Sequence, residues 1–290
     1  MIRISTQLAT HLSRTKKILL PIFLFVCSLP AVALPLKLKK ASYKHNAFIY
    51  WGWNRCAFTT SDVTFHGIGY DIKIKKMVAK DRQSPLGLSP YVQPNQITIP
   101  QYNFRMGYFF KTNYSISFGW DHMKYVMVQN QKAIVNGKIE NTATYYNGTY
   151  IDSLITLKED FVMFEHTDGL NYLNVELRRM DNFWMTHQRK YLQFDINGFE
   201  GIGAGMMYPR SNTTILGNAR YDEFHVAGFG LASVIGLQVL YHKHYFIQGE
   251  LKGGYINMPD VRTTMHPSDY AKQHFFFVQT NFNFGLQFKI

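Results

Sequence analysis

The C-terminal stretch from His274 to Ile290 alternates between apolar and polar side chains without a break. Its even positions carry Phe276, Val278, Thr280, Phe282, Phe284, Leu286, Phe288 and Ile290, and the odd positions from Gln279 onward carry Asn281, Asn283, Gly285, Gln287 and Lys289. Successive side chains of a strand point to opposite faces, so this period of two predicts one long β-strand with one apolar face. A strand crosses a bilayer with roughly 9 to 11 residues, so this one is long enough to span a membrane.

Seven further stretches show strand patterns: 45–58, 97–110, 114–121, 173–178, 192–197, 228–239 and 245–255. The connections after the first, third, fifth and seventh stretches are long, and the other connections are short. Such alternation is typical of membrane barrels, which have short periplasmic turns and long extracellular loops. The sequence therefore predicts an all-β fold, an eight-stranded antiparallel up-and-down transmembrane β-barrel with both termini in the periplasm.

Turn signals and polar segments predict the structure of the connections. We expect a hairpin arm over 63–74, a loop over 82–94, a polar excursion over 129–168 with a turn at Asn136-Gly137, a turn over 181–189, and loops over 209–222 and 257–272.

The N-terminus has the organisation of a secretory signal. Four basic residues precede the apolar segment from Ile18 to Val26, and Ala31 and Ala33 are small residues suited to cleavage. We expect a signal peptide over 1–33, an N-terminal lead-in over 34–45 and a single barrel domain with long extracellular loops over 46–290. Lipoprotein acylation at Cys27 is disfavoured because the preceding Val26 is bulky. Removing the signal lowers the net charge from +12 to +8, since it contains four basic and no acidic residues.

A soluble barrel of the lipocalin type is the alternative fold, because alternation alone does not show which face points outward. The signal segment, the aromatic residues near strand ends and strands longer than the usual ~5 to 6 residues all favour the membrane. After the N-terminus, no apolar run approaches the ~18 residues of a transmembrane helix.

Chains that end in such a strand, with an aromatic residue at or near the end, resemble bacterial outer-membrane β-barrels. Here Phe288 lies two residues before the terminal Ile290. The resemblance covers the architecture of residues 46–290, at the level of small barrels such as the OmpX, OmpW and lipid A deacylase families, and no motif selects one of them. It implies a location in the cell outer membrane and recognition of the terminal strand by the assembly machinery. Outer-membrane lipid and lipopolysaccharide are the other expected partners.

The basic group Lys73, Lys75, Lys76, Lys80 and Arg82 is a candidate for contact with lipopolysaccharide phosphates, or a solvated arm. No phosphate loop or nucleic-acid motif occurs, so we expect no nucleic acid partner.

The inward positions of the predicted strands carry equal numbers of opposite charges. They are Arg105, Arg178, Lys252 and Lys289 against Asp121, Glu176, Asp195 and Glu250. An eight-stranded barrel is just wide enough for side chains to fill it. We therefore predict a packed interior polar network, and a narrow gated channel is the alternative. The network is predicted to contain Arg105, Asp121, Glu176, Arg178, Asp195, Glu250 and Lys252.

An enzyme on this scaffold is a second alternative, because some barrels of similar size are lipid A deacylases or acyltransferases. The His-x-Ser pair of the deacylases has its nearest match at His225-Val226-Ala227, which lacks the hydroxyl. Ser233 lies roughly 27 Å further along the strand. The densest chemistry is in the segment from Glu165 to Asn171, where Glu165, His166 and Asp168 are the catalytic candidates. The other interpretation of this segment is a structural rim, where changing His166 would cost only ~0.5 kcal/mol.

A metal site of the cysteine-rich kind is excluded, because Cys56 is the one cysteine left after the signal. His242 and His244 in a turn could ligate a metal, but exposed turn histidines are usually unliganded. We expect no metal and no cofactor. The expected function is that of a non-enzymatic structural or surface-binding protein with a packed interior. A lipid A-modifying enzyme and a narrow channel remain the alternatives.

Overall fold

The computed structural model describes residues 42–185 and 193–290 as strands, turns and one helical turn, α2 (Leu88–Tyr91). The predicted signal peptide and all but the last residues of the lead-in lie outside the described residues. Within the described ranges, no helix is long and apolar enough to cross a membrane.

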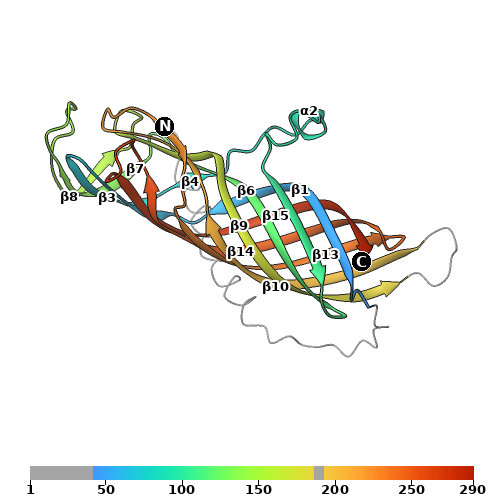
Figure 1. Ribbon diagram of the computed structural model, residues 1–290. Coiled ribbons are helices and arrows are strands. Elements are labelled where there is room, and N and C mark those ends of the chain that lie inside the picture. Colours follow the sequence, from blue (N-terminus) through green and yellow to red (C-terminus); the bar gives the residue numbers. More distant parts are fainter. Residues whose placement is uncertain (1–41, 186–192) are drawn as a thin grey trace, which may run out of the picture. The chain divides into compact units, whose positions relative to one another are not determined.

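Eight strands contain the eight predicted stretches in whole or in part (Figure 1). They are β1 (Asn46–Phe58), β5 (Tyr102–Phe109), β6 (Tyr114–Met127), β9 (Val162–Met185), β10 (Phe194–Met207), β13 (Gly228–Tyr241), β14 (Tyr245–Arg262) and β15 (Tyr270–Lys289). Neighbours in this order pair antiparallel, and β15 also pairs with β1, from Asn46 opposite Lys289 to Phe58 opposite Phe277. The hydrogen-bonded path therefore returns to the strand where it starts.

The remaining strands continue the sheet beyond one end of these eight. They are β2 (Ser61–Gly67), β3 (Tyr70–Met77), β4 (Ala79–Lys80), β7 (Lys132–Ile139), β8 (Gly148–Thr156), β11 (Arg210–Ile215) and β12 (Tyr221–Phe224). The first residues of β15 pair with β2, which pairs in turn with β3, β7 and β8. On the other side, β9 pairs with β11 and β11 with β12. The hairpin arm predicted over 63–74 is confirmed as β2 and β3.

The turn predicted at Asn136-Gly137 is wrong. Both residues lie inside β7, where they are paired with Lys73 and Ile72 of β3. The register between β7 and β8 shifts at this point, and Gly137 has φ +123°. The glycine therefore forms a bulge inside a strand that has partners on both sides, and the hairpin reverses later, between β7 and β8.

Three predicted connections are shorter than expected. β11 and the first residues of β12 lie inside the loop predicted over 209–222, β14 continues to Arg262 inside the loop predicted over 257–272, and β9 runs through Asp181 to Met185. Residues 186–192 of the predicted turn lie outside the described residues. The polar residues of these segments form strands because neighbouring strands pair with their backbones, and such pairing overrides weak intrinsic propensity.

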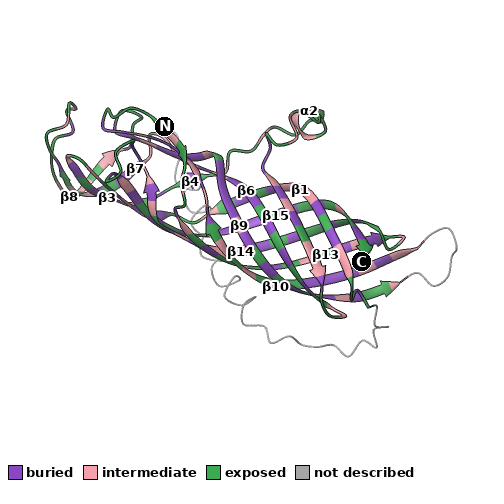
Figure 2. Cartoon of the chain, in the orientation of Figure 1, coloured by how far each residue is buried: buried purple, intermediate pink, exposed green. Residues whose placement is uncertain are grey.

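Buried and exposed residues alternate along the strands (Figure 2). The exposed residues are largely apolar and the buried ones largely polar, which is the inverse of a soluble barrel. In β15, Phe282 is 52% exposed while Gln279 and Asn283 are completely buried. A soluble protein buries such apolar side chains and exposes such amides. We call the outward apolar surface of the eight strands the apolar belt. It contains Ile116, Phe118, Val175, Leu177, Leu231, Ile235, Leu237, Ile247, Leu251, Phe282, Phe284, Leu286 and Phe288.

The interior is divided into layers along the strands. Along β9, buried Tyr172 is followed by Asn174, Glu176 and Arg178, and then by buried Met180. Tyr172 belongs to a large apolar cluster, the extension core, that includes Phe65, Ile72, Val135, Phe164, Ile256 and Phe275. Met180 belongs to a smaller one, the base core, that includes Tyr43, Phe48, Phe109, Phe199, Leu240 and Phe246. A charged layer therefore lies between two apolar cores.

Candidate functional site

Six of the seven predicted interior residues meet in one ion-pair network in the charged layer. Arg105 of β5 lies 2.8 Å from Glu176 of β9, and Arg178 lies 2.6 Å from the other oxygen of Glu176. The Arg178 guanidinium also lies 2.7 Å from Glu250 of β14. Lys252 Nζ completes the network, 2.6 Å from Asp121 Oδ2 and 2.8 Å from Glu176 Oε1. Strand alternation places all six side chains inward, and register brings them to one level.

The network contains three cations and three carboxylates, and neutral groups complete its hydrogen bonds. Tyr50 donates to Glu250 at 3.0 Å, Asn281 donates to the second oxygen of Glu250 at 2.9 Å, and Asn174 donates to Asp121 at 3.0 Å. Buried charges are tolerated only when they are paired and hydrogen-bonded in this way. The arrangement leaves no carboxylate of the network poised to act as a base.

Two residues assigned inward do not take part. Asp195 lies at the beginning of β10, opposite Leu240 and Met185, and forms no ion pair with the network. Its register places it several residues from the charged layer, beside the base core. Lys289 is exposed at the end of β15, where the alternation of buried and exposed residues stops. Both positions fit the period of two, but neither lies at the level of the network.

The catalytic candidates Glu165, His166 and Asp168 do not converge, because they share one strand and point to different sides. His166 is completely buried in the extension core, not at an exposed rim. Its Nδ1 lies 2.9 Å from Ser211 Oγ, and its Nε2 lies 3.0 Å from Gln273 Nε2. Burial lowers the pKa of this imidazole to about 3. The side chain is therefore neutral at ordinary pH.

The two carboxylates beside His166 are used in contacts on the outer side. Glu165 accepts a hydrogen bond from Asn212 at 2.8 Å and pairs with Arg82 at 3.3 Å. Asp168 pairs with Arg210 at 3.3 Å. The register between β6 and β9 shifts at this point, and Gly169 has φ +130°. The segment from Glu165 to Gly169 is therefore an irregular part of β9 that is held in place by contacts with neighbouring strands.

A polar cluster on the outer face lies directly above the apolar belt and was not predicted. His122 Nδ1 lies 2.9 Å from Asn171 Oδ1, and the indole of Trp120 donates to the same oxygen at 2.8 Å. The His122 ring stacks on Tyr102 with centroids 4.8 Å apart. The alternation of side chains along β6 would have predicted the position of His122, because His122 lies on the same face of the strand as Phe118 and Trp120. Aromatic and polar side chains at this level are typical of a membrane-water interface.

A loop over residues 82–100, the side loop, leaves the wall next to this cluster and returns to it. The Asp81 carboxylate accepts the Cys56 N–H at 2.7 Å and also accepts from the side chain of Gln101. The Asn54 N–H donates to the Gln101 carbonyl at 3.2 Å, and Lys124 Nζ donates to the Ile99 carbonyl at 2.8 Å. Both ends of the loop are therefore fixed to the wall.

The predicted basic group is largely neutralised by local acids. Lys73 lies 3.0 Å from Asp62, Lys75 lies 2.8 Å from Asp152, and Arg82 pairs with Glu165. Within residues 42–185 and 193–290, no three His, Cys, Asp or Glu side chains lie close enough to hold a metal ion.

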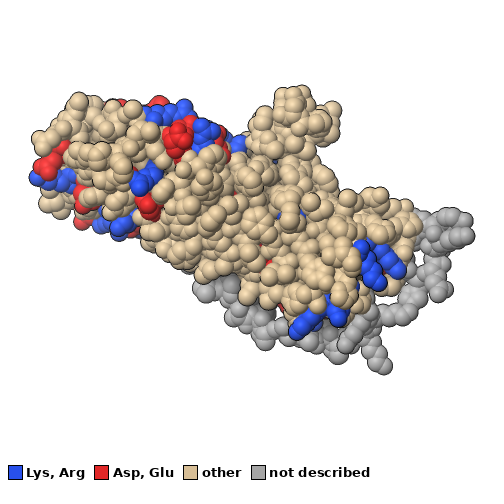
Figure 3. Space-filling view, in the orientation of Figure 1, with Lys and Arg blue, Asp and Glu red and all other residues tan. Residues whose placement is uncertain are grey.

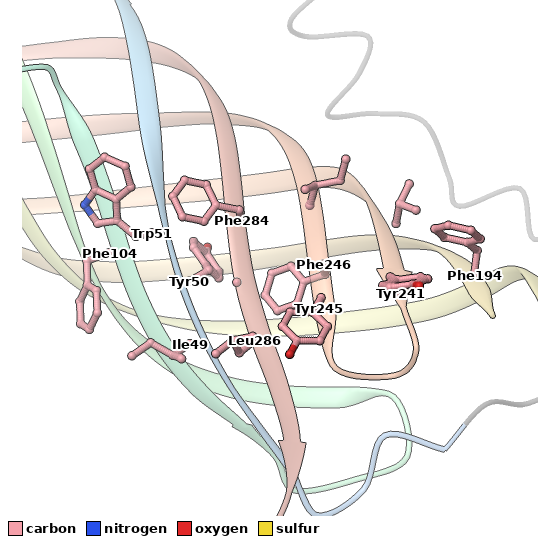
Figure 4. Close-up of a pocket in the computed structure, with 13 residues that line it drawn as sticks. Ile49, Tyr50, Trp51, Phe104, Phe194, Tyr241, Tyr245, Phe246, Phe284 and Leu286 are labelled. Atoms are coloured by element: carbon pink, nitrogen blue, oxygen red, sulfur yellow. The ribbon is translucent and has the colours of Figure 1, made fainter. Parts of the chain in front are cut away.

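An open hollow of about 650 Å³ lies on the wall formed by β1, β13, β14 and β15 (Figure 4). Its lining includes Ile49, Trp51, Tyr245, Phe284 and Leu286, and no charged residue. Gly285 has no side chain, and the rings of Tyr50 and Phe246 beside it also line the hollow. The hollow is therefore part of the apolar belt and not an aqueous site.

No protein-family model and no curated protein matches this chain. Among solved structures, it is similar to Ail, the attachment invasion locus protein of Yersinia pestis, with 12% identity, a TM-score of 0.32, and coverage of 84% of this chain and 99% of that one. It is also similar to outer membrane protein OprG from Pseudomonas aeruginosa, with 12% identity, a TM-score of 0.37, and coverage of 86% of this chain and 99% of that one. For outer membrane protein AlkL the identity is 12%, the TM-score is 0.38, and the match covers 87% of this chain and 95% of that one.

Proposed function

We propose that this chain is an integral outer-membrane β-barrel with a closed interior that presents a rigid extracellular binding surface. Its transmembrane wall consists of eight strands: β1, β5, β6, β9, β10, β13, β14 and β15. The closed path of pairings and the apolar belt support this wall, because a lipid-facing barrel needs every edge paired and apolar side chains outward.

The distribution of charge supports the proposed orientation. Charged side chains gather at the two ends of the molecule and are sparse over the belt between them (Figure 3). At one end, β15 terminates and the short turn 242–244 joins β13 to β14. The opposite end carries β2, β3, β7, β8, β11 and β12. Bacterial barrels place short turns in the periplasm, so the longer end is extracellular.

The layered interior is the observation that carries the functional part of the proposal. A continuous aqueous path along the axis would have to pass the base core, the charged network and the extension core. The network is satisfied internally, and Phe65, Phe164 and Phe275 in the extension core are at most 1% exposed. A barrel filled in this way has no room for an open pore.

The extracellular hairpin of β7 and β8 is the part best suited to binding. Among the described residues, β8 pairs with β7 alone, so its outer edge offers backbone groups for pairing. Ile151 and Leu154 of β8 are 80% and 65% exposed. An unprotected edge with exposed apolar side chains suits the addition of an extended polypeptide strand. The partner class that we propose is therefore a protein segment.

The enzymatic alternative has less support. His225 Nε2 lies 2.9 Å from Asp260 on the outer side, but Ala227 stands where a hydroxyl would be needed. His166 is buried among apolar rings. Lipid A mass spectra of cells with and without the protein should therefore be identical, and loss or gain of an acyl chain would favour the enzyme.

Two measurements on the refolded protein test the main proposal. Heating before electrophoresis should shift the band, because boiling unfolds a barrel that detergent leaves folded. Planar bilayers containing the folded protein should show no steady conductance above the lipid background. A reproducible single-channel current would overturn the closed interior, and recovery in the soluble fraction would overturn the membrane location.

A further inference from the structure

Beyond Arg82, the side loop combines exposed apolar side chains with a lack of charged residues. No Asp, Glu, Lys, Arg or His occurs from Gln83 to Gln101. Leu86 is 79% exposed, Leu88 81% and Val92 64%. Single exposed apolar residues are common on soluble surfaces, but a cluster without a neighbouring charge marks an interaction site.

The loop is attached to the wall at the upper limit of the apolar belt. The ring of Tyr91, in α2, lies 5.6 Å from Trp53 of β1, and Trp53 in turn lies 4.8 Å from Trp51. Two residues further along the same face of β1 comes exposed Arg55. The loop therefore begins where the aromatic side chains end, and it projects sideways from the wall (Figure 1).

The surface of the loop continues the uncharged surface of the wall. In the space-filling view, the projecting part of the loop carries no acidic or basic side chain (Figure 3). The surface beside it toward the apolar belt is also largely uncharged, whereas charged side chains lie on its other side. The exposed apolar side chains of β8 have different neighbours, because Asp152 stands between Ile151 and Leu154 and pairs with Lys75. The two exposed apolar groups are therefore chemically distinct.

Several polar groups of the loop are bonded within it. Tyr91 donates to the Ser84 carbonyl at 2.9 Å, Ser89 donates to the Gln96 side chain at 2.7 Å, and the Val92 N–H donates to the Leu88 carbonyl at 2.8 Å. Polar groups without partners are costly in hydrocarbon, so these internal bonds lower the cost of placing the loop in a lipid environment.

From these observations we propose that the side loop is a membrane anchor. Leu86, Leu88 and Val92 insert among the lipid acyl chains of the outer leaflet beside the wall, while Asp81 and Arg82 stay at headgroup level. This proposal rests on the proposed membrane location of the wall and adds a second, peripheral contact with lipid. Interfacial segments bind in this way when apolar side chains face the acyl chains and no charge must be buried.

Site-specific fluorescence quenching tests the anchor. A bimane label is placed on Leu88→Cys, and the protein is reconstituted into phosphatidylcholine vesicles with brominated acyl chains. Cys56 is buried and should not react with the label. Treating the unsubstituted protein with bimane checks this. Phe282→Cys on the wall is the positive control. Ile151→Cys on β8 is the matched negative control, because Ile151 is as exposed as Leu88.

The expected result is strong quenching at positions 88 and 282, and fluorescence at position 151 equal to that in unbrominated vesicles. Adding Leu86→Asp to the labelled Leu88→Cys protein should reduce the quenching at position 88 at least twofold. Quenching at 282 without quenching at 88 would overturn the anchor and leave the transmembrane wall intact. No quenching at either position would overturn the membrane location itself. Excimer emission from pyrene at position 88 would identify a second copy as the occupant and would also overturn the anchor.

Discussion

Arg178 is the residue on which the interior network most depends, because its guanidinium pairs with both Glu176 and Glu250. Replacing Arg178 by Met removes a cationic partner from both Glu176 and Glu250 in the buried layer. We expect the free energy of unfolding to fall by about 3 to 5 kcal/mol, as when one member of a buried ion pair is removed. Urea unfolding in lipid vesicles, followed by the heat-dependent shift on gels, measures this change.

The adjacent Arg179 provides a control for Arg178. It points outward, is about half exposed and, within the part of the chain that the structure describes, pairs with Asp181 alone. Arg179→Met should therefore change the free energy of unfolding by less than about 1 kcal/mol, the usual range for exposed ion pairs. Equal effects of the two substitutions would show that the buried network does not stabilise the fold.

His166 should make stability depend on pH, although it does not converge with Glu165 and Asp168. His166 lies in the part of β9 that extends beyond the apolar belt, outside the membrane-spanning part of the strand. Burial there lowers its pKa from 6.5 to about 3. Between these values the unfolded chain binds a proton that the folded protein does not. Stability should therefore fall as pH decreases below about 6.5, by up to about 1.4 kcal/mol per pH unit.

The matched variant for this titration is His166→Gln, which keeps a polar group near Ser211 and Gln273. Urea midpoints of both proteins should be compared between about pH 7 and 5, above the range in which most carboxylates titrate. The variant should show the shallower dependence. Identical slopes would show that His166 is protonated in the folded protein, contrary to its buried position.

At the scale of the element, the register shifts explain how polar segments with turn residues form strands. Gly137 lies in β7 with φ +123°, and a Cβ atom built there would lie 2.1 Å from the Asp71 carbonyl oxygen. The bulge therefore needs glycine, since both its backbone conformation and the close approach of β3 exclude a side chain. Gly249 in β14 has open space around it and no such conformation.

We expect Gly137→Ala to loosen the extracellular hairpin without unfolding the wall. The strained backbone should cost about 1 to 3 kcal/mol. Hydrogen exchange should become faster in β3, β7 and β8, while β13 and β14 keep their protection and heating still shifts the band. Gly249→Ala serves as the control and should leave exchange in the hairpin unchanged. Equal protection of the hairpin in both variants would contradict the bulge argument.

At the scale of the whole molecule, the wall is joined where its first strand, β1, meets its last, β15. Phe288 pairs with Ala47 and Lys289 with Asn46, so the last residues of β15 complete the seam with β1. Removing residues 288–290 should strongly reduce the folded, heat-modifiable form in outer membranes. One reason is that the pairing between β15 and β1 becomes shorter. The other is that we propose that the assembly machinery recognises this strand. Ile290→Ala, beyond the end of β15, is the control and should assemble normally. Normal assembly of the truncated chain would contradict both reasons.

The sequence by itself determined the strands of the wall and their two faces, because side-chain alternation is a local property of an extended backbone. Phe282 and Asn283 could be assigned to opposite faces without knowing any partner strand. It also predicted that the six charged residues of the network point inward, but not that Lys289 is exposed or that Asp195 lies below the network, because axial level depends on register between distant strands.

The tertiary structure alone decided the positions of the side chains outside this regular pattern. Glu165, His166 and Asp168 are neighbours in the chain, yet pairing of β9 with β6 and β11 buries the imidazole in the extension core and places the carboxylates beside Arg82 and Arg210. The same pairing brought Asn171 to His122, and the fixed ends of the side loop placed Tyr91 against Trp53. Such contacts depend on strand register and loop closure between segments far apart in the chain, which no local sequence pattern encodes.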